Sequence, residues 1–149
     1  MLPLLLLFIH TGARSQVHSV TIQASGLTCS MCSNAINKSL MSLPVVESVK
    51  ADIKTSSFEV RFKSGSAVDF DQLKKKVEDA GFFVARMDVS IAFNNVSVAN
   101  DSHLQIDGVL YHFLNTGEKT LNGEQSLRIL DKGYVTTKEF KKNAALTKM

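Results

Sequence analysis

The sequence predicts an α+β protein in two parts, and three observations support this prediction. Residues 17–90 contain stretches of alternating apolar and polar residues, typical of half-buried strands, and two stretches of helical periodicity. From Ile91 onward the composition shifts to Asn, Ser, Asp and Gly between short apolar runs, which indicates short strands joined by turns. Glycine-containing dipeptides mark those turns at 107–108, 122–123 and 132–133.

The first strand and the first helix are predicted for residues 18–43. Val20 and Ile22 alternate with polar neighbours, as one face of a half-buried strand requires. Pro44 stops the helix that follows, because proline lacks an amide hydrogen and its ring clashes with the preceding turn. The side chains that fall on one face of this helix are Cys32, Ile36, Leu40 and Leu43.

A second helix is predicted for residues 69–80. Asp69 is a suitable N-cap, because its carboxylate can accept hydrogen bonds from free amide groups of the first turn. Gly81 is a suitable terminator, because glycine adopts the left-handed conformation that often ends a helix. The apolar face of this helix consists of Phe70, Leu73, Val77 and Ala80.

The remaining strands complete the order of the first part. Residues 49–53 and 58–62 alternate around a polar turn and predict a hairpin, and residues 83–89 supply a last strand. The order β-α-β-β-α-β over residues 17–90 is the ferredoxin-like arrangement, in which two helices cover one face of a four-stranded antiparallel sheet. The loop after the first strand and the loop before the last strand then lie at the same end.

The loop after the first strand, residues 26–32 (GLTCSMC), carries both cysteines of the chain. Two thiolates at the spacing of Cys29 and Cys32 can bind one soft metal ion, whereas zinc would require further ligands. Cys32 lies at the start of the helix, where the helix dipole and free amide groups favour the metal-binding thiolate. Cys29 lies in the loop and is expected to be more exposed. Met31 is expected to be exposed and not to serve as a thioether ligand.

Two other roles are open to this pair of cysteines. A disulfide across two intervening residues closes so small a loop that it would stabilise the fold little. A thioredoxin-like redox role also fits a lone C-x-x-C motif. Two features count against the redox role. The chain has no tryptophan, and neither of its two prolines, Pro3 and Pro44, lies between the cysteines or at the later position that thioredoxins use. Metal binding is therefore favoured, and thiol–disulfide exchange is the alternative.

Residues 17–90 resemble the heavy-metal-associated domain family. The run at 26–32 is similar to the family's metal-binding motif, and residues 77–82 (VEDAGF) are similar to the end of its second helix. The family usually has a core-facing methionine where Leu27 stands, and leucine is a near-isosteric replacement there. Phe82 falls where family members place a residue beside the metal, so it would limit access of water to the ion.

The resemblance implies what the domain binds. The family includes copper chaperones, amino-terminal modules of copper-pumping ATPases and a periplasmic mercury-binding protein. By resemblance, Cys29 and Cys32 bind Cu(I) through sulfur, with Hg(II) or another soft metal ion as the alternative. Transfer to a protein partner, such as a copper transporter or an efflux component, is also implied. We expect a binding protein and not an enzyme, because the chain contains no catalytic constellation.

Residues 1–15 are predicted to be a signal peptide. Leu2–Ile9 form an apolar run that is too short to span a bilayer, and the small residues Ala13 and Ser15 are spaced as a signal-peptidase site requires. We expect cleavage after Ser15, no stable membrane insertion afterwards, and a periplasmic or secreted protein. A net charge of +3 without basic blocks interleaved with aromatics predicts no nucleic-acid binding.

The predicted division is therefore a signal peptide at 1–15, a heavy-metal-associated domain at 16–90 and a β-rich module with a terminal helix at 91–149, resembling an incomplete OB-type barrel. Thr136 with Glu139 resembles a capping box that opens this helix. The predicted strands of the module are 96–99, 103–106, 109–114 and 126–130.

The role considered for the β-rich module is docking to a partner. Its two histidines, His103 and His112, sit at similar places in adjacent predicted strands. Together with His18 they are spaced too irregularly to indicate a metal-binding motif, so we expect each to be a surface or strand histidine. A weak second site at His103 and His112 is the open alternative.

Overall fold

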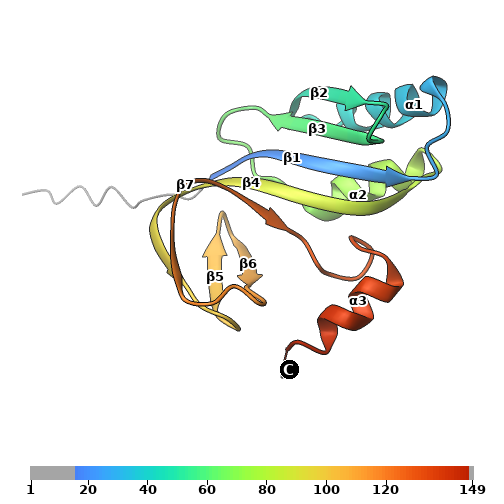
Figure 1. The fold of residues 1–149 in the computed structure, drawn as a ribbon. Helices are drawn as coiled ribbons and strands as arrows, with labels where there is room; N and C mark the ends of the chain where they lie inside the picture. The colour runs from blue at the N-terminus through green and yellow to red at the C-terminus, as the bar shows by residue number, and fades with distance from the viewer. Residues whose placement is uncertain (1–15, 148–149) are drawn as a thin grey trace, which may run out of the picture.

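The structure, a computed structural model, describes residues 16–147 (Figure 1). The predicted signal peptide at 1–15 and its cleavage after Ser15 lie outside the described residues. None of the helices in residues 16–147 combines the length and the apolar composition that a membrane-spanning helix requires. The elements in chain order are β1 (Gln16–Ser25), α1 (Ser30–Met41), β2 (Val46–Asp52), β3 (Ser57–Phe62), α2 (Phe70–Asp79), β4 (Phe83–Val98), β5 (His103–Ile106), β6 (Val109–His112), β7 (Lys119–Arg128) and α3 (Thr137–Ala144).

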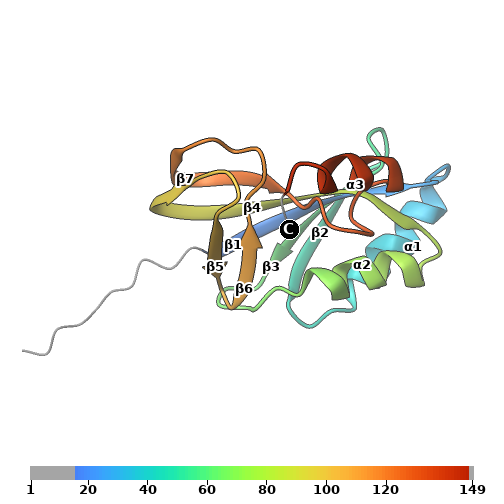
Figure 2. The same cartoon turned by 90° about the horizontal axis from the view of Figure 1, so that it is seen from below.

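The first part of the chain has the predicted ferredoxin-like order β-α-β-β-α-β. The main sheet is antiparallel with the strand order β2-β3-β1-β4-β7, so β1 lies between β3 and β4 as this fold requires. Both α1 and α2 lie on one side of the sheet (Figure 2). Their contact includes a hydrogen bond of 2.7 Å from the Ser39 hydroxyl to the Lys76 carbonyl.

The core lies between the helices and this face of the sheet. In β1, Val20, Ile22 and Ala24 are buried, whereas the residues between them are exposed, as the alternation predicts. Val20 is paired with Val60 on one side and Val89 on the other, so apolar side chains line the same face across three strands. The almost completely buried side chains are Phe58, Ile22, Ile36, Leu40, Leu73, Met87, Ile91, Val20, Val60, Val77 and Val89.

The end of the first part differs from the prediction. β4 continues to Val98, past residue 90, because Ile91 and Phe93 extend its inward-facing apolar alternation. The register shifts after Phe93, where Asn95 has a φ of 50°, and the strand then resumes. The separate strand predicted at 96–99 is therefore mostly the distal half of β4.

β7 takes the place of the OB-type barrel predicted for 91–149. It begins at Lys119, earlier than the predicted strand at 126–130, and pairs antiparallel with β4 along its length. β1 pairs with one edge of the long β4 and leaves the other edge free. β7 pairs with this second edge and satisfies its hydrogen-bonding groups. β5 and β6 form a separate two-stranded sheet. Among the described residues, this region thus extends the main sheet and adds a hairpin and a helix, and does not close a barrel.

Two local predictions in this region are confirmed. Asp107 and Gly108 have φ values of 48° and 82°, as a tight two-residue hairpin turn requires. Thr136 is the N-cap of α3, and its hydroxyl accepts a hydrogen bond from the Glu139 amide at 3.3 Å, which is the N-cap half of the predicted capping box. The Glu139 carboxylate lies 3.5 Å from the Arg128 guanidinium.

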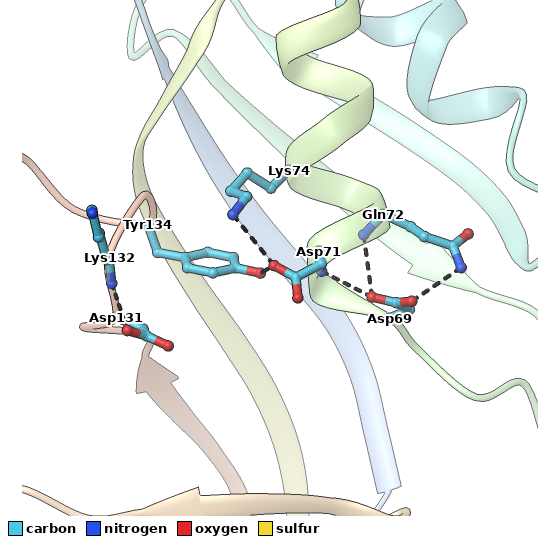
Figure 3. Close-up of polar contacts among 7 residues, drawn as sticks. All are labelled: Asp69, Asp71, Gln72, Lys74, Asp131, Lys132 and Tyr134. Atoms are coloured by element: carbon cyan, nitrogen blue, oxygen red, sulfur yellow. Dashed lines mark hydrogen bonds and ion pairs between the residues drawn. The ribbon is translucent and has the colours of Figure 1, made fainter.

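Tyr134 anchors the region after β7 to α2 (Figure 3). Its side chain is buried, and its hydroxyl donates a hydrogen bond of 2.7 Å to the Asp71 carboxylate in the first turn of α2. The Lys74 ammonium lies 3.3 Å from the same carboxylate and 4.9 Å from the centre of the Tyr134 ring. These three side chains join segments far apart in the sequence, so the second part of the chain stabilises a helix of the first.

Tyr134→Phe is expected to lower the free energy of unfolding by about 1 kcal/mol at neutral pH, because it removes a hydrogen bond to a carboxylate that is itself largely exposed. The hydrogen bond from the Tyr134 hydroxyl lowers the pKa of Asp71 below its usual 3.8, and Lys74 makes the second-largest contribution to this lowering. Folding therefore favours the Asp71 carboxylate, and this contribution is present above the unfolded-state pKa and is lost as the pH falls through the folded-state value.

Urea unfolding of the wild type and of Tyr134→Phe, compared at neutral and acidic pH, tests this account. The difference in unfolding free energy should shrink below about pH 4. A difference that stays constant into the acid range would show that Asp71 does not mediate it.

Candidate metal centre

The cysteine loop lies at the end of the sheet where β1 passes into α1 (Figure 1). Gly26, directly after β1, has a φ of 80°, a left-handed conformation that costs glycine little. Leu27 then packs against the hydrophobic core, as the near-isosteric replacement predicts. The loop is thus tied to the core at Leu27, and the residues that follow, Thr28 and Cys29, are exposed.

Cys29 caps the first turn of α1. Its backbone is extended, with φ −148° and ψ 158°, and its sulfur accepts a hydrogen bond of 3.2 Å from the Cys32 amide. Its carbonyl accepts a hydrogen bond of 3.2 Å from the Ser33 amide, and this is the first backbone hydrogen bond of the helix. A sulfur at this position lies at the positive end of the helix dipole. Once the pair is reduced, this positive end stabilises the negative charge of a thiolate.

The two cysteines are joined as a disulfide, with their Cα atoms 5.3 Å apart. Cys29 is exposed and Cys32 is half-buried, in agreement with the predicted difference in accessibility. A disulfide sulfur is a poor metal ligand, because the thiolate is the binding form. Reduction of this disulfide to two thiols supplies two sulfur ligands from residues three positions apart.

The turn between α2 and β4 lies at the same end as the cysteine loop (Figure 1). The Ser25 hydroxyl donates a hydrogen bond of 3.2 Å to the Phe83 carbonyl, which links the end of β1 to the start of β4. Phe82 is half-buried against the core, whereas Phe83 is 69% exposed. Met31 is 82% exposed, as expected for a methionine that does not serve as a ligand.

The pair offers two protein ligands and not more. Among residues 16–147, no group of three or more His, Cys, Asp and Glu side chains is arranged to hold a metal ion. A structural zinc site needs four ligands. Two neighbouring thiolates instead suit a soft, low-coordinate cation.

A second feature of the surface is an open groove between α2, the β5–β6 hairpin and α3, with a volume of about 1060 Å³. Phe70, Tyr111, Leu127 and Phe140 are among the apolar side chains that line it. Its described lining contains no residue of the cysteine loop, so the groove and the loop are separate features. The predicted docking role of residues 91–149 stays a prediction.

The fold and the site together define a class of protein: a ferredoxin-like α+β domain with two cysteines at the start of its first helix, one as its N-cap and one in its first turn. The family model of the heavy-metal-associated domain matches residues 21–83. This segment is therefore a heavy-metal-associated domain, a class of small metal-binding modules, and the predicted resemblance of the first part of the chain is confirmed.

Several relatives share this segment. The chain is 30% identical over 77 residues to a probable copper-exporting P-type ATPase of Archaeoglobus fulgidus, a match that covers 52% of this chain but only 10% of the ATPase. The yeast copper transporter domain Ccc2a is 32% identical, with 44% of this chain and 88% of that domain covered and a TM-score of 0.40. Oxidized MerP from Ralstonia metallidurans is 26% identical, with 47% and 96% covered and a TM-score of 0.42.

Proposed function

We propose that the protein binds Cu(I) through the sulfur atoms of Cys29 and Cys32 and passes it to a protein partner. The observation that carries this proposal is the position of both cysteines where the exposed loop after β1 meets the first turn of α1 in a heavy-metal-associated domain. The copper-exporting ATPase, whose matching segment is 30% identical, supports copper as the cargo. Two thiolates and no further cysteine favour a soft monovalent ion.

Different groups of the site serve metal binding and metal transfer. The amide groups of the first turn of α1 stabilise negative charge on the sulfurs, so the reduced pair presents two anionic ligands. Cys29 is the more exposed of the two, and a thiolate of the partner reaches the ion from its side. The incoming thiolate forms a third bond to the metal before a bond from this protein breaks, so the ion is never released to water.

The partner proposed is a metal-transfer protein such as a copper transporter or an efflux component. The compartment proposed is the periplasm or the extracellular space, on the strength of the signal-peptide pattern in residues 1–15. The cysteine pair would have to be kept reduced there for loading, because the disulfide form has no thiolate to offer.

Two further candidates use the same cysteines. Hg(II) is also a soft ion that prefers thiolates, so mercury binding needs no other residue. Thiol–disulfide exchange is favoured by the disulfide itself. An insulin-reduction assay distinguishes thiol–disulfide exchange from metal binding. Turnover of insulin disulfides, together with no metal binding by the reduced protein, would identify a redox protein.

Competition for Cu(I) under anaerobic conditions tests the proposal. The reduced protein is titrated with the Cu(I) complex of bicinchoninic acid, and we expect it to withdraw one equivalent of copper from the chelator. Failure to withdraw any copper, with the fold intact by circular dichroism, would contradict Cu(I) binding.

Met31→Leu is expected to leave the Cu(I) affinity within about threefold of the wild type. The Met31 side chain is 82% exposed, and a thioether is a weaker ligand than either neighbouring thiolate. The same chelator competition measures it, and this variant is a matched control for substitutions at the cysteines. A tenfold or larger loss would mean that the thioether binds the ion.

A further inference from the structure

The β5–β6 hairpin brings two imidazole rings together. His103 and His112 are directly opposite each other in the strand register. Their rings are stacked, with centroids 4.3 Å apart and planes 10° from parallel. His103 is exposed, and the His112 side chain keeps 19% of its surface exposed. An ion in solution can therefore reach both rings from the surface of the hairpin.

Asp101 sets the orientation of one of these rings. Its carboxylate Oδ1 lies 2.5 Å from Nε2 of His112. A carboxylate only accepts hydrogen bonds, so this contact places the ring proton on Nε2 and leaves Nδ1 of a neutral His112 with a free lone pair. An imidazole that binds a metal ion usually donates its other N–H group to a carboxylate or a carbonyl, and Asp101 and His112 have this arrangement.

The backbone holds Asp101 in place. Its φ of 63° is left-handed, and its amide donates a hydrogen bond of 2.8 Å to the Phe113 carbonyl, in the residue after His112. The Phe113 amide returns a hydrogen bond of 2.9 Å to the Ser102 carbonyl. These two bonds fix the segment before β5 against the segment after β6, so the carboxylate and the imidazole stay in register.

From these contacts we propose that His103 and His112 form a surface site for Cu(II), with Asp101 as a positioning residue. Imidazole nitrogens suit divalent copper, which is the tightest binder in the divalent first-row series at such ligands. Rotation about χ2 of His103, a broad torsion in histidine, turns one nitrogen of its ring toward an ion bound at Nδ1 of His112, whose ring stays against Asp101. Water completes the coordination, as expected for a site with two protein ligands.

This site is chemically distinct from the cysteine loop and does not depend on the function proposed for it. Thiolates select Cu(I), whereas imidazoles accept Cu(II), so the chain would bind the two oxidation states of copper at different places. Binding of Cu(II) at the hairpin involves no electron transfer. The two proposals can therefore fail independently of each other.

The full chain is titrated with a Cu(II) salt in its disulfide form, because this form has no thiolate that could bind or reduce the ion. Electron paramagnetic resonance should show one equivalent of bound Cu(II) with hyperfine coupling to two nitrogens. His103→Asn and His112→Asn should each weaken binding at least tenfold and reduce the coupling to one nitrogen. Asp101→Asn should weaken binding about tenfold while both nitrogens remain coupled, because it alters only the support of His112.

In the full 149-residue chain, in which Gln16 is not the amino terminus, His18→Asn is the matched control, because His18 is an exposed histidine on β1. This variant should bind Cu(II) as the wild type does. Circular dichroism checks that each variant is folded, and the Cu(I) affinity of the reduced variants should be unchanged. Wild-type Cu(II) affinity in both hairpin variants, or an equal loss in His18→Asn, would overturn the site. Wild-type affinity in Asp101→Asn would overturn the positioning role.

Discussion

Cys29→Ser and Cys32→Ser should each weaken Cu(I) binding by more than about 100-fold. Loss of a supporting residue around a metal typically costs 10- to 100-fold, and loss of one of only two ligands should cost more. A serine hydroxyl is a hard, protonated oxygen that does not replace a thiolate toward a soft ion. Both effects are measured by anaerobic competition with a Cu(I) chelator.

The fold should survive these substitutions. Cys29 is exposed and Cys32 half-buried, and neither belongs to the buried core. Serine at position 29 can also still cap α1, because its hydroxyl accepts hydrogen bonds from amide groups of the first turn. Thermal unfolding within a few degrees of the wild type, beside unchanged Cu(I) affinity in either variant, would refute the assigned ligands.

Oxidation should abolish Cu(I) binding by the unmodified protein. Closing the Cys29–Cys32 disulfide releases two protons and two electrons and leaves no thiolate, so both ligands are lost in one step. Two samples, one reduced with a phosphine and one oxidised, are mixed with Cu(I) under argon, and the copper retained after gel filtration is measured. The reduced sample should retain one equivalent and the oxidised sample none.

Reversibility and the Met31→Leu variant are the controls for this prediction. Renewed reduction of the oxidised sample should restore binding in full, and Met31→Leu should respond to oxidation as the wild type does. Retention of one equivalent by the fully oxidised protein would place the copper at some other group and would contradict the proposed ligands.

Local patterns in the sequence predicted much of the first part of the fold. The alternation around Val20 and Ile22 and the cap at Asp69 each act within a few residues, and the structure confirms them. The Asp69 carboxylate, for example, accepts hydrogen bonds of 3.0 and 3.2 Å from the amides of Asp71 and Gln72. The first helix ends before Pro44 as predicted, but already at Met41, so Leu43 lies past its end. The cysteine loop was likewise predictable, because a glycine turn and a helix start determine its position.

The second part was less predictable because its contacts are not local. The pairing of β7 with β4 depends on a free edge that becomes evident only once β4 is seen to run to Val98. The hydrogen bond from Tyr134 to Asp71 joins residues 63 positions apart. The contact between Asp101 and His112 was not predictable, because an Asp–His contact across a hairpin has no sequence signature of its own.

The central claim, that reduced Cys29 and Cys32 together bind one thiophilic cation, is tested most directly by native mass spectrometry of the reduced protein with Cu(I) and a competing chelator. The account predicts a single copper adduct in the wild type and none in the Cys29→Ser/Cys32→Ser double variant. A copper adduct of equal abundance in both proteins, or its absence from the folded, reduced wild type, would contradict it.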